Sequence, residues 1–215
     1  SEAWRANEEA HRALAEELAS DGRVIALDLP GFGESPEPPT PRSMADSGDL
    51  IADVVDRLGL VDPVLVGHSM GTQVVVEAVA RHPRVSDRVV LIAPTVNATE
   101  RSVRQQAWRM LQDLVDENPR VIWVGAVHYI KTGPRWLFRK LRVMLDHRIE
   151  DVLPRLHADV LVLRGADDRV CPHDWCTQVA ALLLHGRMSE IPERGHEAMI
   201  TNPHPVAELI RAHAG

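Results

Sequence analysis

Cysteine and aromatic side chains are scarce in this chain of 215 residues. Its two cysteines, Cys171 and Cys176, are too few for a disulfide framework, and no further cysteine stands near them to complete a zinc site. Such sparse cysteines are typical of proteins from reducing compartments. We therefore expect two reduced thiols, no metal site and a cytoplasmic protein.

Long apolar runs and an excess of positive charge are also missing. No stretch of about 18 apolar residues occurs, so the sequence predicts no membrane-spanning helix. Residues 1–20 form an acidic amphipathic pattern, which differs from a signal peptide. The net charge of −7 disfavours general binding to nucleic acid or to an anionic membrane. A content of 45% hydrophobic residues is sufficient for one folded domain with a sizeable core.

Short apolar runs alternate with helix-compatible segments along the chain. The expected strands are residues 23–29, 64–66, 89–92, 160–163 and 187–191. The expected helices are residues 2–19, 45–58 and 72–80, one whose first residue is Pro172, and residues 205–213. Solidly apolar strands that alternate with helices indicate an α/β fold, in which helices cover both faces of a mostly parallel sheet.

One long interval, residues 96–157, interrupts this alternation. A structureless loop of that length is unusual in a compact domain, so we expect a helical insertion, or lid, on a core formed by residues 1–95 and 158–215. The insertion has 11 Lys and Arg against 7 Asp and Glu, unlike the acidic remainder of the chain. Four of its aromatic residues are candidate substrate contacts, with packing of the lid onto the core as the alternative role of each: Trp108, Trp123, Tyr129 and Trp136.

The segment Gly67-His68-Ser69-Met70-Gly71 has the pattern of a nucleophile elbow. In that motif a serine lies on a tight turn between a strand and a helix, and the flanking glycines leave room for the turn. The Ser69 hydroxyl would then lie at a helix N-terminus, with the backbone N–H of Met70 directed at a developing oxyanion. An ordinary strand–turn–helix junction is the alternative, because G-x-S-x-G alone is weak evidence. We expect His68 to be a packing residue.

A serine nucleophile needs a base and an acid, and two later strands end beside candidates for both roles. Gly165-Ala166-Asp167-Asp168 follows the expected strand at 160–163, and Gly195-His196 follows the last one. The carboxyl ends of parallel strands meet at one edge of a sheet, where ligands bind in such folds. The chain order is therefore serine, aspartate, histidine.

Together, four segments resemble the α/β-hydrolase superfamily of esterases, lipases and C–C hydrolases. They are residues 28–35 (Asp-Leu-Pro-Gly-Phe-Gly-Glu-Ser), the elbow at 67–71, residues 165–170 (Gly-Ala-Asp-Asp-Arg-Val) and Gly195-His196. The resemblance implies Ser69 as nucleophile, His196 as base and Asp168 as acid, with Asp167 as the alternative acid. It implies a serine hydrolase that cleaves a carboxylic ester, thioester or lactone, with a small-molecule acyl substrate and no cofactor.

The resemblance leaves other activities open. C–C bond hydrolases and cofactor-free perhydrolases use the same triad, and a relative that binds a ligand without catalysis is a further alternative. The family also places a strand ending in His-Gly before the first helix, and its loop supplies the second oxyanion N–H. No such strand precedes Ser1, so the resemblance implies a chain that lacks its first strands and this donor. We expect such a polypeptide to be less stable and less active.

A basic stretch inside the lid suggests a second kind of partner. Five cationic residues lie close together there, and they would suit an anionic acyl carrier: Lys131, Arg135, Arg139, Lys140 and Arg142. A solvated helix face without a partner is the alternative.

Overall fold

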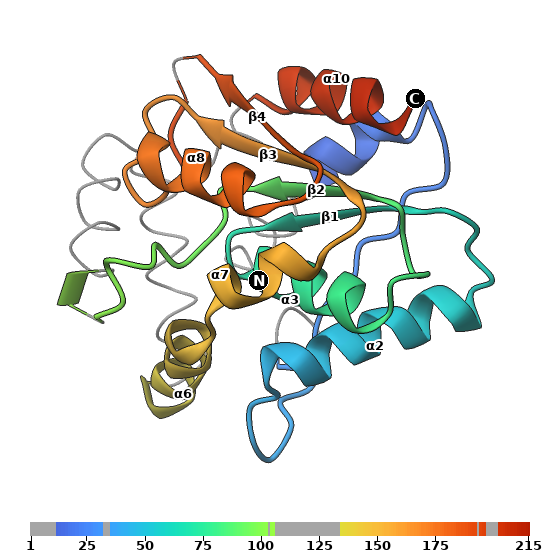
Figure 1. Cartoon of the computed structure of the whole chain (residues 1–215). Helices are drawn as coiled ribbons and strands as arrows, with labels where there is room; N and C mark the ends of the chain where they lie inside the picture. The colour runs from blue at the N-terminus through green and yellow to red at the C-terminus, as the bar shows by residue number, and fades with distance from the viewer. Residues whose placement is uncertain (1–11, 32–34, 103, 106–133, 193, 197–201) are drawn as a thin grey trace.

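A four-stranded parallel sheet lies at the centre of the part of the chain that the structure describes (Figure 1). This computed structural model describes residues 12–31, 35–102, 104–105, 134–192, 194–196 and 202–215. The strands follow one another in the order β1 (Val64–His68), β2 (Arg88–Ile92), β3 (Asp159–Gly165) and β4 (Gly186–Ile191), each parallel to the next. The strands predicted at 64–66, 89–92, 160–163 and 187–191 and the α/β fold class are therefore confirmed.

Helices cover both faces of this sheet (Figure 1). On one face lie α3 (Met70–Arg81) and α8 (His173–Leu182), and α2 (Met44–Arg57) packs against α3. On the other face lie α10 (Pro203–Ala214) and the helical residues 12–18. The predicted helices at 45–58, 72–80 and 205–213 are confirmed.

Two helix predictions need qualification. The sequence predicts a helix whose first residue is Pro172. In the structure Pro172 is the N-cap of α8, and the helix begins one residue later, at His173. Of the helix predicted at 2–19, residues 1–11 lie outside the described residues, and residues 12–18 are helical. Their last turn is fastened to α10, because the Arg211 guanidinium donates to the backbone oxygen of Glu17 and, at 2.6 Å, to the Asp21 carboxylate.

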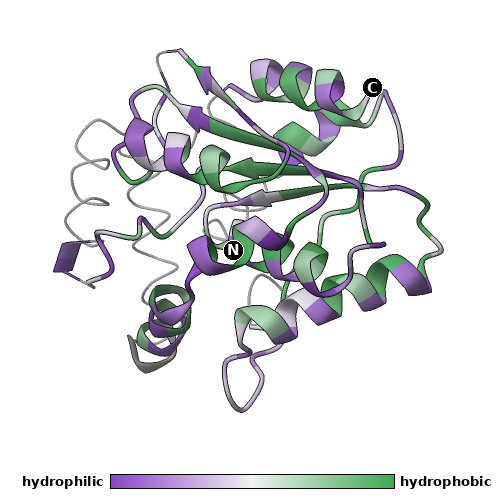
Figure 2. Cartoon of the chain, in the orientation of Figure 1, coloured by the Kyte–Doolittle hydropathy of each residue, from purple (hydrophilic) through white to green (hydrophobic). Residues whose placement is uncertain are grey.

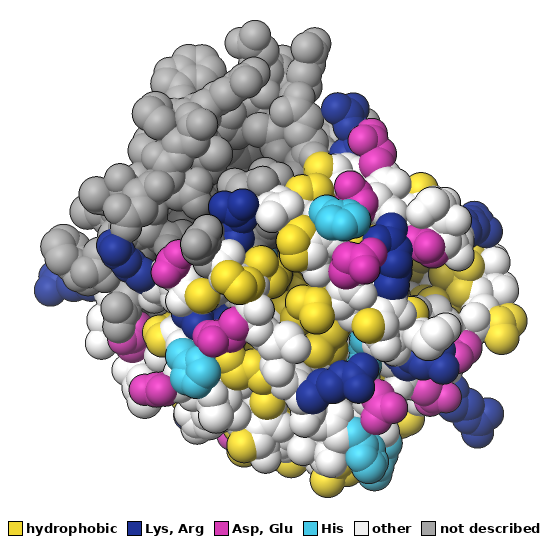
Figure 3. All heavy atoms as spheres, turned by 90° about the horizontal axis from the view of Figure 1, so that it is seen from above, with side chains coloured by type: hydrophobic (Ala, Val, Ile, Leu, Met, Phe, Trp, Pro, Cys, Tyr) yellow, Lys and Arg dark blue, Asp and Glu magenta, His cyan; other side chains and the backbone are white. Residues whose placement is uncertain are grey.

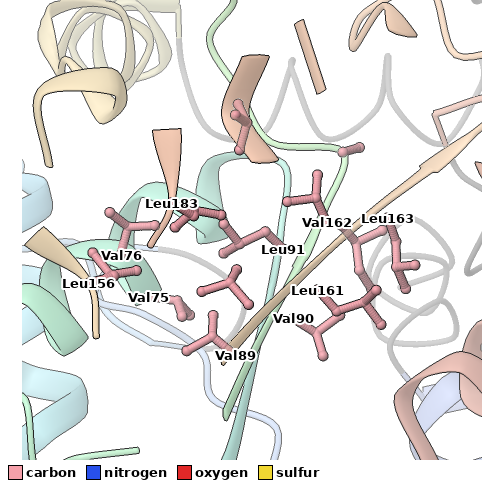
Figure 4. Close-up of a cluster of buried hydrophobic side chains, with 14 of the residues drawn as sticks. Val75, Val76, Val89, Val90, Leu91, Leu156, Leu161, Val162, Leu163 and Leu183 are labelled. Carbon is pink, nitrogen blue, oxygen red and sulfur yellow. The ribbon is translucent and has the colours of Figure 1, made fainter. Parts of the chain in front are cut away.

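The two central strands form the core. The runs 89–92 in β2 and 160–163 in β3 are at most 3% exposed. Their side chains share one buried cluster with Val75 and Val76 of α3 (Figure 4) and with Val206 and Ile210 of α10. Figure 2 shows the same strands as the most continuously hydrophobic segments of the sheet. A strand buried on both faces has no solvent side, which explains why these runs are apolar at every position instead of alternating.

Residues 23–29, predicted as a strand, form neither strand nor helix, so this prediction is wrong. Val24 and Leu27 are 40% and 46% exposed. A strand requires a neighbour for its ladder of backbone hydrogen bonds, and among the described residues no strand lies beyond β1 to provide one. An apolar run bounded by turn residues shows a tendency to form a strand, but the pairing partner decides the outcome.

Residues 134–155 of the predicted lid are mostly helical and contact α3 of the core. It contains α6 (Pro134–Asp146), α7 (Ile149–Val152) and the short 3₁₀ helix η1 (Leu153–Arg155). Gln73 of α3 donates to the backbone oxygen of Met144 at 3.0 Å, and His147 lies 2.8 Å from the Glu77 carboxylate. The division into core and lid stays a prediction.

The surface of the described residues carries mixed charges. On the face seen in Figure 3, Lys and Arg side chains lie interspersed with Asp and Glu. Several are paired: Arg211 contacts both Asp21 and Glu208, for example. In the described ranges, none of the helices has the length and apolar character needed to cross a bilayer.

Candidate active site

Ser69 lies between β1 and α3 with a strained backbone. Its φ of 50° and ψ of −120° are uncommon for a residue that carries a Cβ. The turn is tight because Gly67 lets β1 approach the start of α3, and a Cβ at Gly67 would lie 2.6 Å from the backbone oxygen of Gly71. The Ser69 N–H donates to the Ile92 oxygen at 2.9 Å, which ties the turn to the end of β2. Strain of about 1–3 kcal/mol persists only where surrounding structure enforces it, and it is typical of functional sites.

The structure brings Ser69, His196 and Asp168 into one chain of contacts. Ser69 Oγ lies 3.2 Å from His196 Nε2, and His196 Nδ1 lies 2.9 Å from Asp168 Oδ2. A carboxylate can only accept, so the imidazole proton lies on Nδ1 and donates to Asp168. Nε2 then carries the lone pair that faces the serine hydroxyl. Asp167, the alternative acid, is exposed, whereas Asp168 is 2% exposed.

The buried Asp168 carboxylate is stabilised as an anion. Its other oxygen, Oδ1, accepts from the backbone N–H groups of Val170 and Cys171, both at 2.8 Å. Burial opposes ionisation and would raise the pKa of Asp168, but His196, the Cys171 N–H and Arg164 together hold that pKa below its ordinary value. Asp168 is therefore charged at neutral pH and able to stabilise an imidazolium.

His68 makes a polar contact with the segment that carries His196. Its Nε2 lies 3.3 Å from the backbone oxygen of His196, and the two rings lie 5.2 Å apart with their planes tilted by 44°. The residue before Ser69 thus contacts the segment that carries the imidazole. The prediction of a packing residue missed this polar contact, because two elements 128 positions apart meet there.

The position of Met70 suits it for binding an oxyanion. It is the first residue of α3, where backbone N–H groups lack intrahelical partners and the helix dipole favours negative charge. Met70 also borders an apolar pocket between α2, α3 and α6, with Leu29, Met44, Val74 and Val143 among its lining residues. The expectation of a missing second oxyanion donor stays a prediction.

The four predicted lid contacts lie, wholly or in their side chains, outside the described residues. Trp108, Trp123 and Tyr129 lie outside the described residues, and Trp136 is on α6 with its side chain likewise outside them. The same applies to Lys131 and to the Arg135 side chain of the predicted basic stretch.

Two other members of that basic stretch are engaged within the protein. Lys140 is only 8% exposed and donates to the backbone oxygen of Gly31. Arg142 is exposed and lies 3.5 Å from Asp146. A docking face for an acyl carrier stays a prediction, and Lys140, which is buried against Gly31, does not belong to an exposed basic face.

Gly165 packs closely against the segment that carries His196. It ends β3, and an added Cβ would collide with the backbone oxygens of Arg194 and Gly195, next to His196. We expect Gly165→Ala to displace the His196 segment and to lower the rate of ester hydrolysis by about 10²-fold, because a displacement of about 1 Å has that effect on positioned groups. Assays with p-nitrophenyl acetate and thermal unfolding would measure both consequences. Gly22→Ala is the matched control, since its Cβ would meet nothing within 4 Å; equal activity of the two variants would contradict the prediction.

Comparison with known proteins finds similar sequences and similar folds. The sequence model of a protein family described as "Alpha/beta hydrolase family" matches residues 1–209 of this chain. A putative non-heme haloperoxidase of Mycobacterium phage D29 is 28% identical over 231 aligned positions, covering 94% of this chain and 81% of the relative. An esterase from Exiguobacterium antarcticum superposes with a TM-score of 0.81 at 18% identity, covering 98% of this chain and 88% of its own. A meta-cleavage product hydrolase from Pseudomonas fluorescens gives 0.72 at 20% identity, covering 94% and 83%.

Proposed function

This chain belongs to the alpha/beta hydrolase family, and from that premise we propose that it is a serine hydrolase. Its substrate is a carboxylic ester, thioester or lactone, and cleavage proceeds through an acyl-enzyme on Ser69. The observation that carries the proposal is the continuous contact from Ser69 Oγ through His196 to Asp168, at 3.2 Å and 2.9 Å. Such a chain couples removal of the serine proton to attack on a carbonyl.

In the proposed mechanism the imidazole of His196 moves the protons. Nε2 takes the hydroxyl proton as Ser69 Oγ attacks the carbonyl carbon, and the Met70 N–H donates to the resulting oxyanion. The imidazolium then gives the proton to the leaving oxygen or sulfur as the acyl bond breaks. Water, deprotonated by the same Nε2, attacks the acyl-enzyme, and the imidazolium returns that proton to Ser69 Oγ as the acyl–oxygen bond breaks and the carboxylic acid is released. Asp168 stabilises the imidazolium in both halves of the reaction.

Burial makes these contacts effective. Asp168 is 2% exposed, and attraction between charges is stronger where water is excluded. Its Oδ1 is held by two backbone N–H groups, so Oδ2 has little freedom to turn away from His196. The elbow acts at the other end, since the strained Ser69 backbone holds Oγ beside the N-terminus of α3. The reacting groups are thus positioned before substrate arrives.

We also propose that residues 96–157 act as a lid that shapes the acyl pocket. The apolar pocket beside Met70 supports this, because α6 contributes Val143 to its wall. The Arg101 side chain supports it as well: it donates to the backbone oxygens of Leu145 and His147 and pairs with Glu150, which joins the two ends of the segment. The aromatic residues of the segment remain candidate substrate contacts.

Labelling with a fluorophosphonate probe tests the proposed function. These probes react with an activated serine, so we expect covalent modification of wild-type protein at Ser69, located by mass spectrometry. Ser69→Ala should abolish the labelling, and Ser20→Ala, which alters an exposed serine, should leave it unchanged. A wild-type protein that takes no label, or a Ser69→Ala variant that labels equally, would contradict the proposal and favour a relative that binds ligands without catalysis.

A further inference from the structure

An arginine lies buried in β3 directly after the apolar run 160–163, close to the proposed acid. Arg164 in β3 is 4% exposed. Burying a guanidinium is costly unless its charge is paired and its donors are used, so the partners of its nitrogens determine what it can do there. Most of those partners belong to residues 166–171, which we call the acid loop, because this segment follows β3 and contains Asp168.

The guanidinium donates to three carbonyl groups of the acid loop. Nε donates to the backbone oxygen of Cys171 at 2.9 Å, and Nη2 donates to those of Ala166 at 3.1 Å and Asp168 at 3.0 Å. These oxygens come from the first, middle and last residues of the loop. One rigid planar group thus fixes the whole span, which a single ammonium nitrogen has no geometry to do.

The charge of Arg164 is balanced on its outer side. Glu190 is its register partner in β4, and Arg164 Nη1 pairs with the Glu190 carboxylate. The same carboxylate oxygen lies 2.9 Å from His173 Nδ1 at the start of α8. Hydrogen bonds from His173 and from Arg164 hold the pKa of Glu190 below its ordinary value, so the pair is charged at neutral pH. The guanidinium is therefore held by Glu190 through Nη1, and Nε and Nη2 donate to the acid loop.

Five backbone N–H groups of the acid loop already have acceptors, some outside the loop and some on Asp168 itself. Ala166 N–H donates to the Ile191 oxygen, Asp167 N–H to the Arg194 oxygen, and Asp168 N–H to the Gly165 oxygen, at 2.8–3.1 Å. Val170 and Cys171 donate to Asp168 Oδ1. Without Arg164, the inward-facing carbonyls of Ala166, Asp168 and Cys171 would lose their donor, and an unsatisfied buried carbonyl favours rearrangement of the loop.

We propose that Arg164 is a positioning residue, which fixes the acid loop so that Asp168 Oδ2 faces His196. This inference rests on the proposed function. Arg164 touches neither Ser69 nor His196 in the described contacts, so its influence on catalysis passes through Asp168. Its loss should therefore slow the chemical step and leave substrate binding nearly unchanged.

The test is a double-mutant cycle between Arg164 and Asp168. Arg164→Met keeps the apolar stem and removes every donor, and we expect about a 10²-fold loss of kcat on p-nitrophenyl acetate with little change in KM. In an Asp168→Asn background the same change should lower kcat almost no further, because the effects of residues that act as a unit are not additive.

Arg164→Lys keeps the positive charge on a single nitrogen and should recover only part of the rate. Arg211→Met is the matched control, since it removes an arginine that donates to a backbone oxygen far from the site; it should leave kcat unchanged.

The outcomes separate this inference from the proposed function. Absence of Ser69 labelling in wild type would count against the function itself. A labelled wild type with a fully active Arg164→Met or Arg164→Lys variant would overturn the role of Arg164 alone. An Arg164→Met loss that is equally large with and without the Asp168→Asn substitution would overturn it too. Should Arg164→Met fail to fold, the cycle is run with Arg164→Lys.

Amide hydrogen exchange gives an independent readout of the acid loop. The N–H groups of Val170 and Cys171 are held by Asp168 Oδ1, so their protection reports whether the loop keeps its conformation. Protection at both amides should fall in the Arg164 variants and stay intact in Arg211→Met. Unchanged protection in the Arg164 variants would overturn the inference.

Discussion

Ser69→Ala should lower kcat for hydrolysis of p-nitrophenyl acetate by about 10⁴- to 10⁶-fold, the loss typical of removing a catalytic serine. The hydroxyl is the proposed nucleophile, and Oγ makes its contact with His196 at 3.2 Å. Alanine keeps the Cβ, so the strained backbone of the elbow is unchanged. Steady-state kinetics and detection of the acyl-enzyme by mass spectrometry would measure the loss.

Folding should be nearly unaffected by this change, which separates chemistry from stability. The backbone bond from Ser69 N–H to the Ile92 oxygen remains in the variant. Thermal unfolding midpoints of wild type, Ser69→Ala and the exposed control Ser20→Ala should therefore agree closely. Retention of wild-type turnover by a folded Ser69→Ala protein would refute the acyl-enzyme mechanism.

Much of this architecture could be predicted from local pattern. The runs at 89–92 and 160–163 are apolar at every position because both faces of the sheet are covered, and burial dictates composition there. The elbow at 67–71 was recognisable because steric constraint leaves few alternatives: a Cβ at Gly67 meets backbone atoms at 2.6–2.9 Å. In these places the physical requirement lies within a few neighbouring residues.

Other features depend on partners that are distant in sequence. Residues 23–29 have the composition of a strand, but among the described residues they lack a neighbour with which to pair. Nothing in the neighbouring sequence indicates that the Arg164 guanidinium meets three carbonyl groups of the following loop. The available signal was a charged residue directly after the apolar run 160–163, where continued burial would require charge pairing. The opposing Glu190 becomes evident only once the register of β3 and β4 is known.

The resemblance already favours Asp168 over Asp167 as the acid, and the structure adds a physical difference between the two carboxylates. Both carboxylates follow β3, and adjacent residues on a turn point in different directions. Asp168 is buried with its Oδ2 at 2.9 Å from His196 Nδ1, whereas Asp167 is exposed. This difference provides a prediction in which two neighbouring, isosteric substitutions should have opposite outcomes.

Asp168→Asn should lower kcat by about 10⁴-fold, the effect seen when the acid of such a triad becomes an amide. In this protein the reason lies in the backbone around the side chain. The amide oxygen takes the position of Oδ1, where it accepts from Val170 and Cys171 N–H, and this directs the NH₂ group at His196 Nδ1. Nδ1 must then accept, so the imidazole proton moves to Nε2. An Nε2–H facing Ser69 Oγ cannot take the hydroxyl proton.

Asp167→Asn is the matched control and should retain wild-type activity, because the Asp167 backbone N–H bond to Arg194 O is kept and its side chain is exposed. The pH dependence of stability gives a further readout of Asp168→Asn. Since the folded-state pKa of Asp168 lies below its ordinary value of 3.8, its stabilising contribution is present above that value and is lost as pH falls through the folded-state pKa. Asp168→Asn should therefore lose part of the steepness of acid unfolding. Equal activity of the two variants, or a larger loss in Asp167→Asn, would reassign the acid.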